Sequence, residues 1–396
     1  MRKIILSFTC LAGLCACQTQ HDGYTINGRI AGNSEGMKVQ LMDETDYPPT
    51  VIDSAVIQQG KFQLKGKIEQ PGRYLLTIDK TGEGDPTDML ASRFYLENSV
   101  ISYSGHIDSL RTFYWSDESF RKDPVIQGSA TQDLFMQYQN STAALRKESN
   151  AINQQYYETY LQPTLSGEFH TEAGIALIKR QNEITRQLEL AQWEFIEQNP
   201  GTIVGYDLAL QFLLGMYVNL TAPQLSQLTE IITRAWSAQP AMVENFKALA
   251  EKARKMAIGE KYQDIELMNP AGETVKLSEY VPSGKYVMLE FWASWCGPCR
   301  GEIPHLRHVY REYQDKGFEI VSISVDENKA DWEKAMQEEK MTWKQLCDPQ
   351  GLQGVVAQKY NISGVPTCIL LDPEGRIFKT DMRGAALDEV LQEVCQ

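Results

Sequence analysis

The segment that decides the fold of this chain is Phe291-Trp292-Ala293-Ser294-Trp295-Cys296-Gly297-Pro298-Cys299-Arg300-Gly301-Glu302-Ile303-Pro304. It follows the apolar run Tyr286–Trp292, which we expect to be a buried strand, and it opens a helical pattern over Pro298–Lys316. Cys296 and Cys299 therefore stand at the start of a helix, where unpaired backbone N–H groups favour a thiolate at Cys296. Pro298 is tolerated there because the first turn of a helix does not need its N–H group.

The sequence around this segment alternates between strand and helix patterns over residues 259–396, which predicts an α/β domain. Further strands are expected at Tyr262–Met268, Glu273–Leu277, Phe318–Val325, Thr367–Leu371 and Arg376–Thr380. Further helices are expected at Lys329–Lys340, Gly351–Tyr360 and Ala385–Val394.

Two cysteines separated by two residues support two kinds of chemistry. The pair can close a small disulfide, with the sulfur of Cys296 exposed and that of Cys299 beneath it. The pair could instead be half of a zinc site, which needs a second pair or histidines at suitable spacing. His305 and His308 lie on the following helix, but a Cys-x-x-Cys motif between a strand and a helix favours redox chemistry. We therefore expect a redox-active Cys296–Cys299 disulfide, no metal and no further cofactor.

The quoted segment resembles the thioredoxin superfamily, and in particular its extracytoplasmic TlpA/ResA-like thiol–disulfide oxidoreductases. The resemblance covers about the last third of the chain and includes a second element, Gly364-Val365-Pro366-Thr367, before a strand. It implies that Pro366 is cis and lies against the disulfide, and that Val365 hydrogen-bonds the substrate backbone. The expected substrate-binding residues are Trp295, Gly297, Pro298, Val365 and Pro366.

Two glutamates are candidates to carry the proton that Cys299 must lose when it resolves a mixed disulfide. Glu290 lies six residues before Cys296 in an otherwise apolar strand, at the position that the thioredoxin resemblance assigns to a buried acid. Glu302, three residues after Cys299, matches the active-site glutamate of the ResA-like branch, although acids are common in first helical turns anyway. Two carboxyl groups near one apolar site do not both ionise cheaply, so one should stay protonated near neutral pH. Because Glu302 lies one helical turn past Cys299, we expect it to dominate the proton transfer.

The first residues are typical of an exported lipoprotein. A basic start precedes a short apolar run, and Leu14-Cys15-Ala16-Cys17 resembles a bacterial lipobox. We expect residues 1–16 to be a signal peptide and Cys17 to carry diacylglycerol. An ordinary cleaved secretory signal is the alternative, and both take the mature chain out of the cytoplasm. The apolar stretch Ile203–Leu220 is interrupted by polar residues and is expected to be a buried helix rather than a membrane span.

The 396-residue chain is expected to be a multi-domain α+β protein. Residues 17–126 are rich in β-branched runs and turn signals, which predict an antiparallel β domain. Residues 127–258 are predicted to form four to five helices, with a break at Gln162-Pro163, and residues 259–396 a thioredoxin-like α/β fold. The β-rich part resembles the domain of unknown function that precedes thioredoxin-like domains in many bacterial lipoproteins. A net charge of −14 argues against nucleic acid as a partner.

Together these features predict a membrane-anchored thiol–disulfide oxidoreductase on the periplasmic face of the cell envelope. The resemblance implies that it reduces disulfides of envelope proteins, such as apocytochromes, and that a membrane electron donor recharges it. A thiol peroxidase is one alternative, but that chemistry needs Pro and Thr or Ser where this chain has Leu289 and Ala293. A surface binding or assembly lipoprotein with an auxiliary redox domain is another. Cys347, Cys368 and Cys395 are expected to be buried free thiols, and a Cys347–Cys368 pair is the alternative for two of them.

Overall fold

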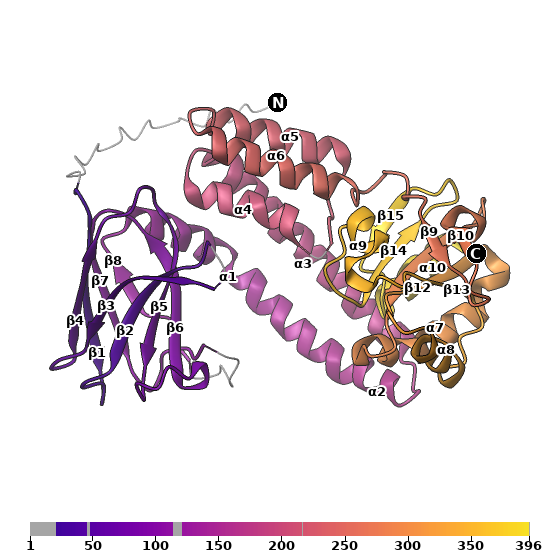
Figure 1. Ribbon diagram of the computed structural model, residues 1–396, viewed down its shortest axis with the longest axis horizontal. Helices are drawn as coiled ribbons and strands as arrows, with labels where there is room; N and C mark the ends of the chain where they lie inside the picture. The colour runs from indigo at the N-terminus through magenta and orange to yellow at the C-terminus, as the bar shows by residue number, and fades with distance from the viewer. Residues whose placement is uncertain (1–20, 46–47, 114–120, 216, 396) are drawn as a thin grey trace, which may run out of the picture. The chain divides into compact units, whose positions relative to one another are not determined.

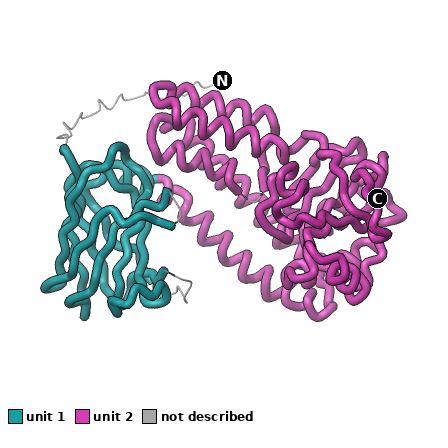
Figure 2. Tube along the Cα trace, in the orientation of Figure 1, with its two compact units in different colours: residues 1–137 teal, residues 138–396 magenta. Residues whose placement is uncertain are grey.

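The computed structural model describes residues 21–45, 48–113, 121–215 and 217–395. The predicted signal peptide and Cys17 lie outside these described ranges. The chain divides into two compact units, Met1–Gln137 and Tyr138–Gln396 (Figure 2). The second unit holds most of the helical segment together with the predicted α/β domain, and the domain boundaries drawn from the sequence stay predictions.

The first unit is built from two four-stranded sheets (Figure 1). One has the order β4 (Lys61–Gly66), β1 (Tyr24–Ala31), β7 (Val100–His106) and β8 (Val125–Gln127). The other has the order β3 (Thr50–Val56), β2 (Lys38–Asp43), β5 (Gly72–Asp79) and β6 (Met89–Leu96). Buried side chains alternate along β1, and apolar residues from both sheets form one core. Among the described strands the pairing is antiparallel, as predicted, except that β1 and β7 are parallel.

Helices follow these strands along the chain, and the first of them crosses the sequence boundary between the units. They are α1 (Ala130–Tyr156), the π-helical turn η3 (Tyr157–Leu161), α2 (Gln162–Leu165), α3 (Thr171–Gln198), α4 (Ile203–Leu214), α5 (Ala222–Ala235) and α6 (Pro240–Arg254). The backbone stays helical through the predicted break at Gln162-Pro163, because η3 continues directly into α2, and the helical run ends three residues later than the predicted break, after Leu165. In the part of the chain that the structure describes, no helix is both long and apolar enough to cross a membrane.

The remaining residues form a seven-stranded sheet with helices packed on it (Figure 1). Its order is β10 (Thr274–Lys276), β9 (Glu266–Met268), β13 (Lys344–Cys347), β12 (Phe318–Ser324), β11 (Tyr286–Trp292), β14 (Thr367–Leu371) and β15 (Ile377–Thr380). The helices are α7 (Gly297–Tyr313), α8 (Lys329–Glu338), α9 (Val355–Tyr360) and α10 (Ala385–Val394). Strand β11 is parallel to β12 and antiparallel to β14, and all seven residues of β12 are buried. This arrangement confirms the predicted α/β fold, although the sequence patterns predict no strand at β13.

The helical segment packs directly on this sheet domain. Tyr160 of η3 belongs to a buried apolar cluster that includes Ala385 of α10. A glycine makes this approach possible, because a Cβ at Gly174 of α3 would lie 2.8 Å from the Cβ of Ala385 and 2.3 Å from the Tyr160 ring. In addition α2 touches α7, where a Cβ at Gly301 would lie 3.2 Å from the side chain of Leu165. The helical segment and the sheet domain are therefore fitted to each other at two places.

We expect Gly174→Val to lower the free energy of unfolding of the second unit by about 1–3 kcal/mol, because the added carbons overpack the contact between α3 and α10. Six of the seven tryptophans lie in that unit, so urea unfolding followed by tryptophan fluorescence measures the change. The matched control is Gly201→Val, since nothing lies within 4 Å of a Cβ there. The control should change stability by less than about 0.5 kcal/mol. Equal losses in the two variants would contradict this account of the packing.

Candidate active site

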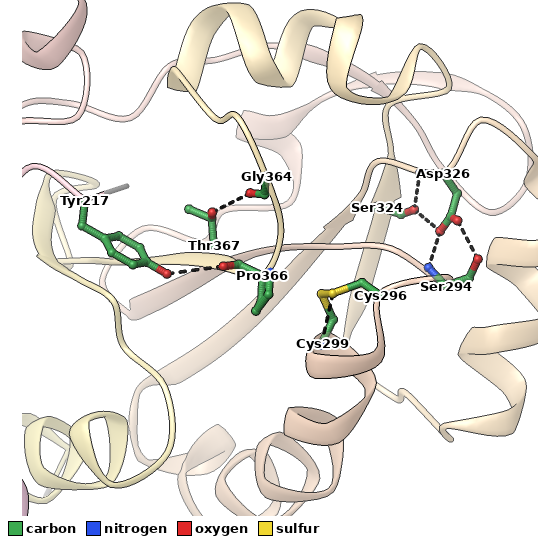
Figure 3. Close-up of a disulfide and its surroundings, with 9 residues drawn as sticks. All are labelled: Tyr217, Ser294, Cys296, Cys299, Ser324, Asp326, Gly364, Pro366 and Thr367. Atoms are coloured by element: carbon green, nitrogen blue, oxygen red, sulfur yellow. Dashed lines mark hydrogen bonds between the residues drawn. A yellow bond between two sulfur atoms is a disulfide. The ribbon is translucent and has the colours of Figure 1, made fainter. Parts of the chain in front are cut away.

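Cys296 and Cys299 form a disulfide at the junction of β11 and α7 (Figure 3). Cys296 is the N-cap residue of α7, and its Sγ accepts a hydrogen bond from the backbone N–H of Cys299 at 3.2 Å. Cys299 is fully buried, Cys296 is 4% exposed and the neighbouring Trp295 is 63% exposed. Gly297 and Pro298 are exposed beside it. The pair therefore reaches the surface through Cys296, where the positive end of the helix dipole faces the sulfur.

A hydrogen-bonded carboxylate holds the turn that carries the cysteines. The buried side chain of Asp326, just after β12, accepts bonds from the backbone N–H of Ser294 at 2.9 Å and from its hydroxyl at 2.6 Å (Figure 3). It also accepts a bond from the hydroxyl of Ser324 at 2.6 Å. These bonds tie the residues before Cys296 to the end of β12.

The Val365–Pro366 peptide bond is cis, as the resemblance implies, and it immediately precedes β14. The register of β14 against β11 puts Pro366 at the end of β11 that leads to Cys296, and Figure 3 shows it next to the disulfide. Val365 and Pro366 are both half-buried. The helical segment also reaches this loop, because the hydroxyl of Tyr217 lies 3.5 Å from the carbonyl oxygen of Pro366. The disulfide is thus bordered by a backbone segment that is partly open to solvent.

Glu290 lies on β11 with 3% of its surface exposed. Ser322 of β12 donates its hydroxyl hydrogen to Glu290 Oε2, and the indole N–H of Trp343 donates to Ser322 Oγ at 2.7 Å. Burial raises the pKa of Glu290 to about 7, the hydrogen bond from Ser322 opposes this rise, and the negative charge of Glu302 adds to it. Glu290 is therefore a carboxyl group that exchanges its proton near neutral pH.

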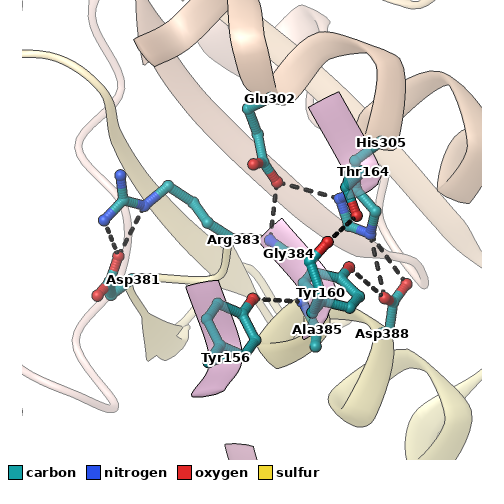
Figure 4. Close-up of polar contacts among 10 residues, drawn as sticks. All are labelled: Tyr156, Tyr160, Thr164, Glu302, His305, Asp381, Arg383, Gly384, Ala385 and Asp388. Carbon is teal, nitrogen blue, oxygen red and sulfur yellow. Dashed lines mark hydrogen bonds and ion pairs between the residues drawn. The ribbon is translucent and has the colours of Figure 1, made fainter. Parts of the chain in front are cut away.

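Glu302 takes part in a different set of contacts, which Figure 4 shows. Its Oε1 accepts a hydrogen bond from the backbone N–H of Gly384 at 2.7 Å and lies 3.0 Å from Nδ1 of His305. The other ring nitrogen of His305 lies 3.1 Å from both carboxylate oxygens of Asp388. Tyr160 of η3 donates its hydroxyl hydrogen to Asp388 at 2.9 Å. This chain of contacts joins α7 and α10 to the helical segment.

The His305 ring at the centre of this network is 1% exposed as a residue. Burial by itself would lower the pKa of His305, but the hydrogen bonds and negative charges of Asp388 and Glu302 outweigh it and raise the pKa to about 10. The imidazole is therefore protonated at neutral pH and directs both N–H groups at carboxylates, which leaves no nitrogen lone pair for zinc. Within the described ranges, no cluster of three or more His, Cys, Asp or Glu side chains is arranged to hold a metal ion.

The three remaining cysteines of the described chain, Cys347, Cys368 and Cys395, are buried and free, which confirms the prediction and leaves Cys347 and Cys368 unpaired with each other. Burial raises the pKa of Cys347 to about 12 and that of Cys368 well above its ordinary value. Cys368 is the register partner of Glu290. These thiols stay neutral inside the domain, whereas Cys296 stands at a helix start.

The predicted site residues fall into two groups, those around the disulfide and the two glutamates. Several of their hydrogen-bond partners were not predicted from the sequence. Trp295, Gly297, Pro298 and the Val365–Pro366 bond surround the disulfide, while Glu290 and Glu302 influence each other through charge but hydrogen-bond to different groups. Asp326 follows an apolar strand pattern directly, and a carboxylate at the end of a parallel strand is a signal that sequence alone offers. No local pattern marks Tyr217, Asp388 or Tyr160, because their partners are far away in the sequence.

Comparison with known proteins agrees with this geometry. Residues 258–380 match the AhpC/TSA family, and residues 24–135 match a domain of unknown function (DUF4369). The thiol-disulfide oxidoreductase ResA of Oceanobacillus iheyensis is 32% identical over 154 residues, which are 38% of this chain and 76% of that protein. ResA of Geobacillus kaustophilus is 34% identical over 122 residues, which are 31% of this chain and 67% of that protein.

A solved structure of a thiol-disulfide oxidoreductase from Bacteroides fragilis covers 34% of this chain and 98% of its own, at 36% identity and a TM-score of 0.32. The matched regions contain the junction of β11 and α7 with its cysteine pair, and the β domain ahead of the helices. The family match and the ResA relatives therefore confirm the resemblance that the sequence motifs indicated. The chain belongs to the thiol-disulfide oxidoreductases of the ResA/TlpA type, as an enzyme whose thioredoxin-like domain is preceded by a DUF4369 domain.

Proposed function

We propose that this chain is a lipid-anchored protein of the cell envelope that reduces disulfides of envelope proteins through its Cys296-Gly297-Pro298-Cys299 centre. The observation that carries this proposal is the disulfide at the start of α7, with one sulfur near the surface beside the cis Val365–Pro366 bond. Residues 1–16 are the proposed signal peptide, Cys17 is the proposed lipid attachment site, and the proposed location is the periplasmic face of a membrane.

In the reduced enzyme, the thiolate of Cys296 attacks the substrate disulfide, and a mixed disulfide forms while one substrate thiolate leaves. Cys299 then gives up its proton, and its thiolate attacks the Sγ of Cys296. The second substrate sulfur leaves as a thiolate, and the Cys296–Cys299 disulfide closes. Two electrons have passed from the enzyme to the substrate, and a membrane electron donor returns two electrons to the enzyme for the next cycle.

The substrate in this proposal is an extended polypeptide segment that carries a cysteine. The half-buried backbone at Val365 offers hydrogen-bonding groups to such a segment, in the manner of an added strand. The exposed ring of Trp295, with Gly297 and Pro298 next to it, offers apolar contact area on the other side of Cys296. Pro366 completes this surface next to the disulfide.

We assign to Glu290 the role of accepting the proton of Cys299. Glu302 acts on Glu290 through its charge. Sequence position favours Glu302, because it lies one helical turn past Cys299. Two features support Glu290 instead. Its pKa of about 7 lets the carboxyl group take up and release a proton at neutral pH. Oε1 of Glu302 is already engaged by the N–H group of Gly384 and by His305.

Replacing Cys299 by serine should trap the substrate as a stable mixed disulfide on Cys296, because the thiol that resolves this intermediate is missing. Non-reducing electrophoresis of acid-quenched envelopes, followed by peptide mass spectrometry, measures the trapped complex and names the partner. Cys395→Ser is the matched control, since it removes a buried free thiol of the same domain and should trap nothing. The two roles would be reversed if a complex formed on Cys299 in a Cys296→Ser variant while the Cys299→Ser variant trapped none.

Glu290→Gln should slow the resolving step by about 100-fold and abolish the pH dependence of its rate around pH 7. Glu290 accepts a proton only as a carboxylate, so the wild-type rate should rise as the pH increases through its pKa of about 7. Single-turnover reduction of insulin disulfides, from mildly acidic to mildly basic pH, measures both effects.

Two further variants complete this comparison. Glu302→Gln should keep the inflection near neutral pH, and Glu319→Gln, which changes an 8%-exposed carboxylate of β12 outside the site, should change neither rate nor profile. If the inflection were lost in Glu302→Gln but kept in Glu290→Gln, Glu302 rather than Glu290 would be the proton acceptor.

Cys17→Ser should move the protein from the membrane to the soluble envelope fraction, because it removes the proposed acyl attachment point. Cell fractionation followed by immunoblotting measures the distribution. Cys10→Ser and Cys15→Ser are the matched controls within the same leader and should leave the protein on the membrane. Membrane association that persists in Cys17→Ser would mean that a lipid on this residue does not hold the protein there.

A further inference from the structure

Four buried side chains form a row across four neighbouring strands of the sheet. The register pairs Cys368 of β14 with Glu290 of β11, and Glu290 with Ser322 of β12. It also pairs Ser322 with Gln345 of β13. Register partners point to the same face of a sheet, and adjacent strands lie about 4.8 Å apart. The exposed fractions of the four residues range from 0% for Ser322 to 6% for Gln345, so the row is closed off from water along its length.

The hydroxyl group of Ser322 is oriented from one side. The indole N–H of Trp343 can only donate, so at 2.7 Å it occupies a lone pair of Ser322 Oγ. The single hydroxyl hydrogen of Ser322 then goes to Glu290 Oε2. This arrangement suits an ionised Glu290, whose oxygens only accept. Once Glu290 carries a proton, its own O–H group needs an acceptor, and Ser322 Oγ is the polar atom already in contact with it.

Gln345 supplies what the protonated arrangement lacks. Both polar atoms of its side chain are buried and have no hydrogen-bond partner among the described residues, which is an unfavourable state for an amide. Gln345 also lines a surface groove together with Tyr280, Met336, Met341 and Trp343. Its amide oxygen Oε1 is therefore an acceptor without a partner among the described residues, on the residue that is the register partner of Ser322.

We propose that Gln345 is a positioning residue that accepts the hydroxyl hydrogen of Ser322 whenever Glu290 is protonated. In that state Glu290 donates to Ser322 Oγ, and Ser322 turns its hydrogen away from Glu290 to Oε1 of Gln345. Rotation about a single bond of Ser322 exchanges the two arrangements. The inference rests on the proposed role of Glu290 as the acceptor of the Cys299 proton.

The proton steps balance without any change in electron count. The thiol of Cys299 and the carboxylate of Glu290 become a thiolate and a carboxylic acid. The rearrangement at Ser322 then moves a hydrogen bond only, because Gln345 is a neutral amide that accepts a hydrogen bond at Oε1 and takes up no proton.

Other charged groups around Glu290 are few within the described chain. Glu302 on α7 acts on it through charge, and Cys368 on β14 is a neutral thiol, because burial raises its pKa well above the ordinary value. In the loop after β15, Asp381 and Arg383 form an ion pair at 2.9 Å and act on Cys368. Variants of Ser322 and Gln345 leave these groups unchanged, so a shift in the pKa of Glu290 in such a variant can be assigned to the substituted side chain.

The test is the pH profile of single-turnover reduction of a small aromatic disulfide, measured for two variants that should shift in opposite directions. Gln345→Met keeps the volume but removes the acceptor for the protonated state, so the inflection should move to lower pH by about 0.5 to 1 unit. Ser322→Ala removes a donor to the carboxylate and an acceptor for the acid, and because the bond to the charged form is the stronger of the two, the inflection should move to higher pH. Gln337→Met, an exposed glutamine of the same groove, is the matched control and should not shift it.

A second readout does not depend on turnover. The carboxyl band of Glu290, taken from infrared difference spectra of the oxidised protein against Glu290→Gln, should titrate with the same opposite shifts. Shifts of equal sign in the two variants, or none in Gln345→Met while Glu290→Gln abolishes the inflection, would overturn the role of Gln345 and leave the proposed function intact. An inflection that survives in Glu290→Gln would overturn the proton role of Glu290 and this inference with it.

Discussion

The cost of keeping a carboxyl group inside a β-sheet governs the chemistry of this protein. Glu290 stands on an interior strand, and removing its carboxylate from water is unfavourable unless hydrogen bonds or opposite charges make up for the loss. One serine hydroxyl offsets only part of that cost, so the group keeps a high affinity for a proton. His305 shows the opposite solution, because two carboxylates surround the buried cation. In our proposal, Glu290, whose burial is only partly offset, moves the proton, while His305, whose charge is balanced, holds α7 and α10 together.

The sheet delivers the other parts of the site to one edge. Strand β11 ends at the turn before Cys296, and its parallel neighbour β12 ends shortly before Asp326, whose carboxylate holds that turn. On the other side, the antiparallel β14 begins just after Pro366. Because hydrogen-bonded register fixes these three strand ends relative to each other, the cysteines and the cis bond need no flexible loop to meet. The pairing of the strands, rather than the conformation of each loop, thus determines where each reacting group lies.

Local patterns predict much of this structure, and distant contacts account for what they miss. The strands β11, β12 and β14 and the helix that starts after Cys296 follow from apolar runs and from the proline and cysteine spacing. Strand β13 has only four residues, three of them buried, so it shows neither length nor alternation. The contacts of His305 with Asp388 and of Tyr160 with Asp388 join residues 83 and 228 positions apart, beyond the reach of any local pattern. For the same reason, sequence spacing alone favours Glu302 over Glu290.

The close approach of α3 to α10 also bears on how such a chain can change over generations. Gly174 and Ala385 come from segments more than 200 residues apart, yet a side chain at position 174 would meet both the Tyr160 ring and Ala385. Tyr160 likewise closes over Asp388, so a redox domain taken without the helical segment would return that carboxylate to water. Substitutions on the two sides are therefore tolerated best in compatible pairs, and a recombinant that exchanged only one of the two segments would need a new partner surface that fits it.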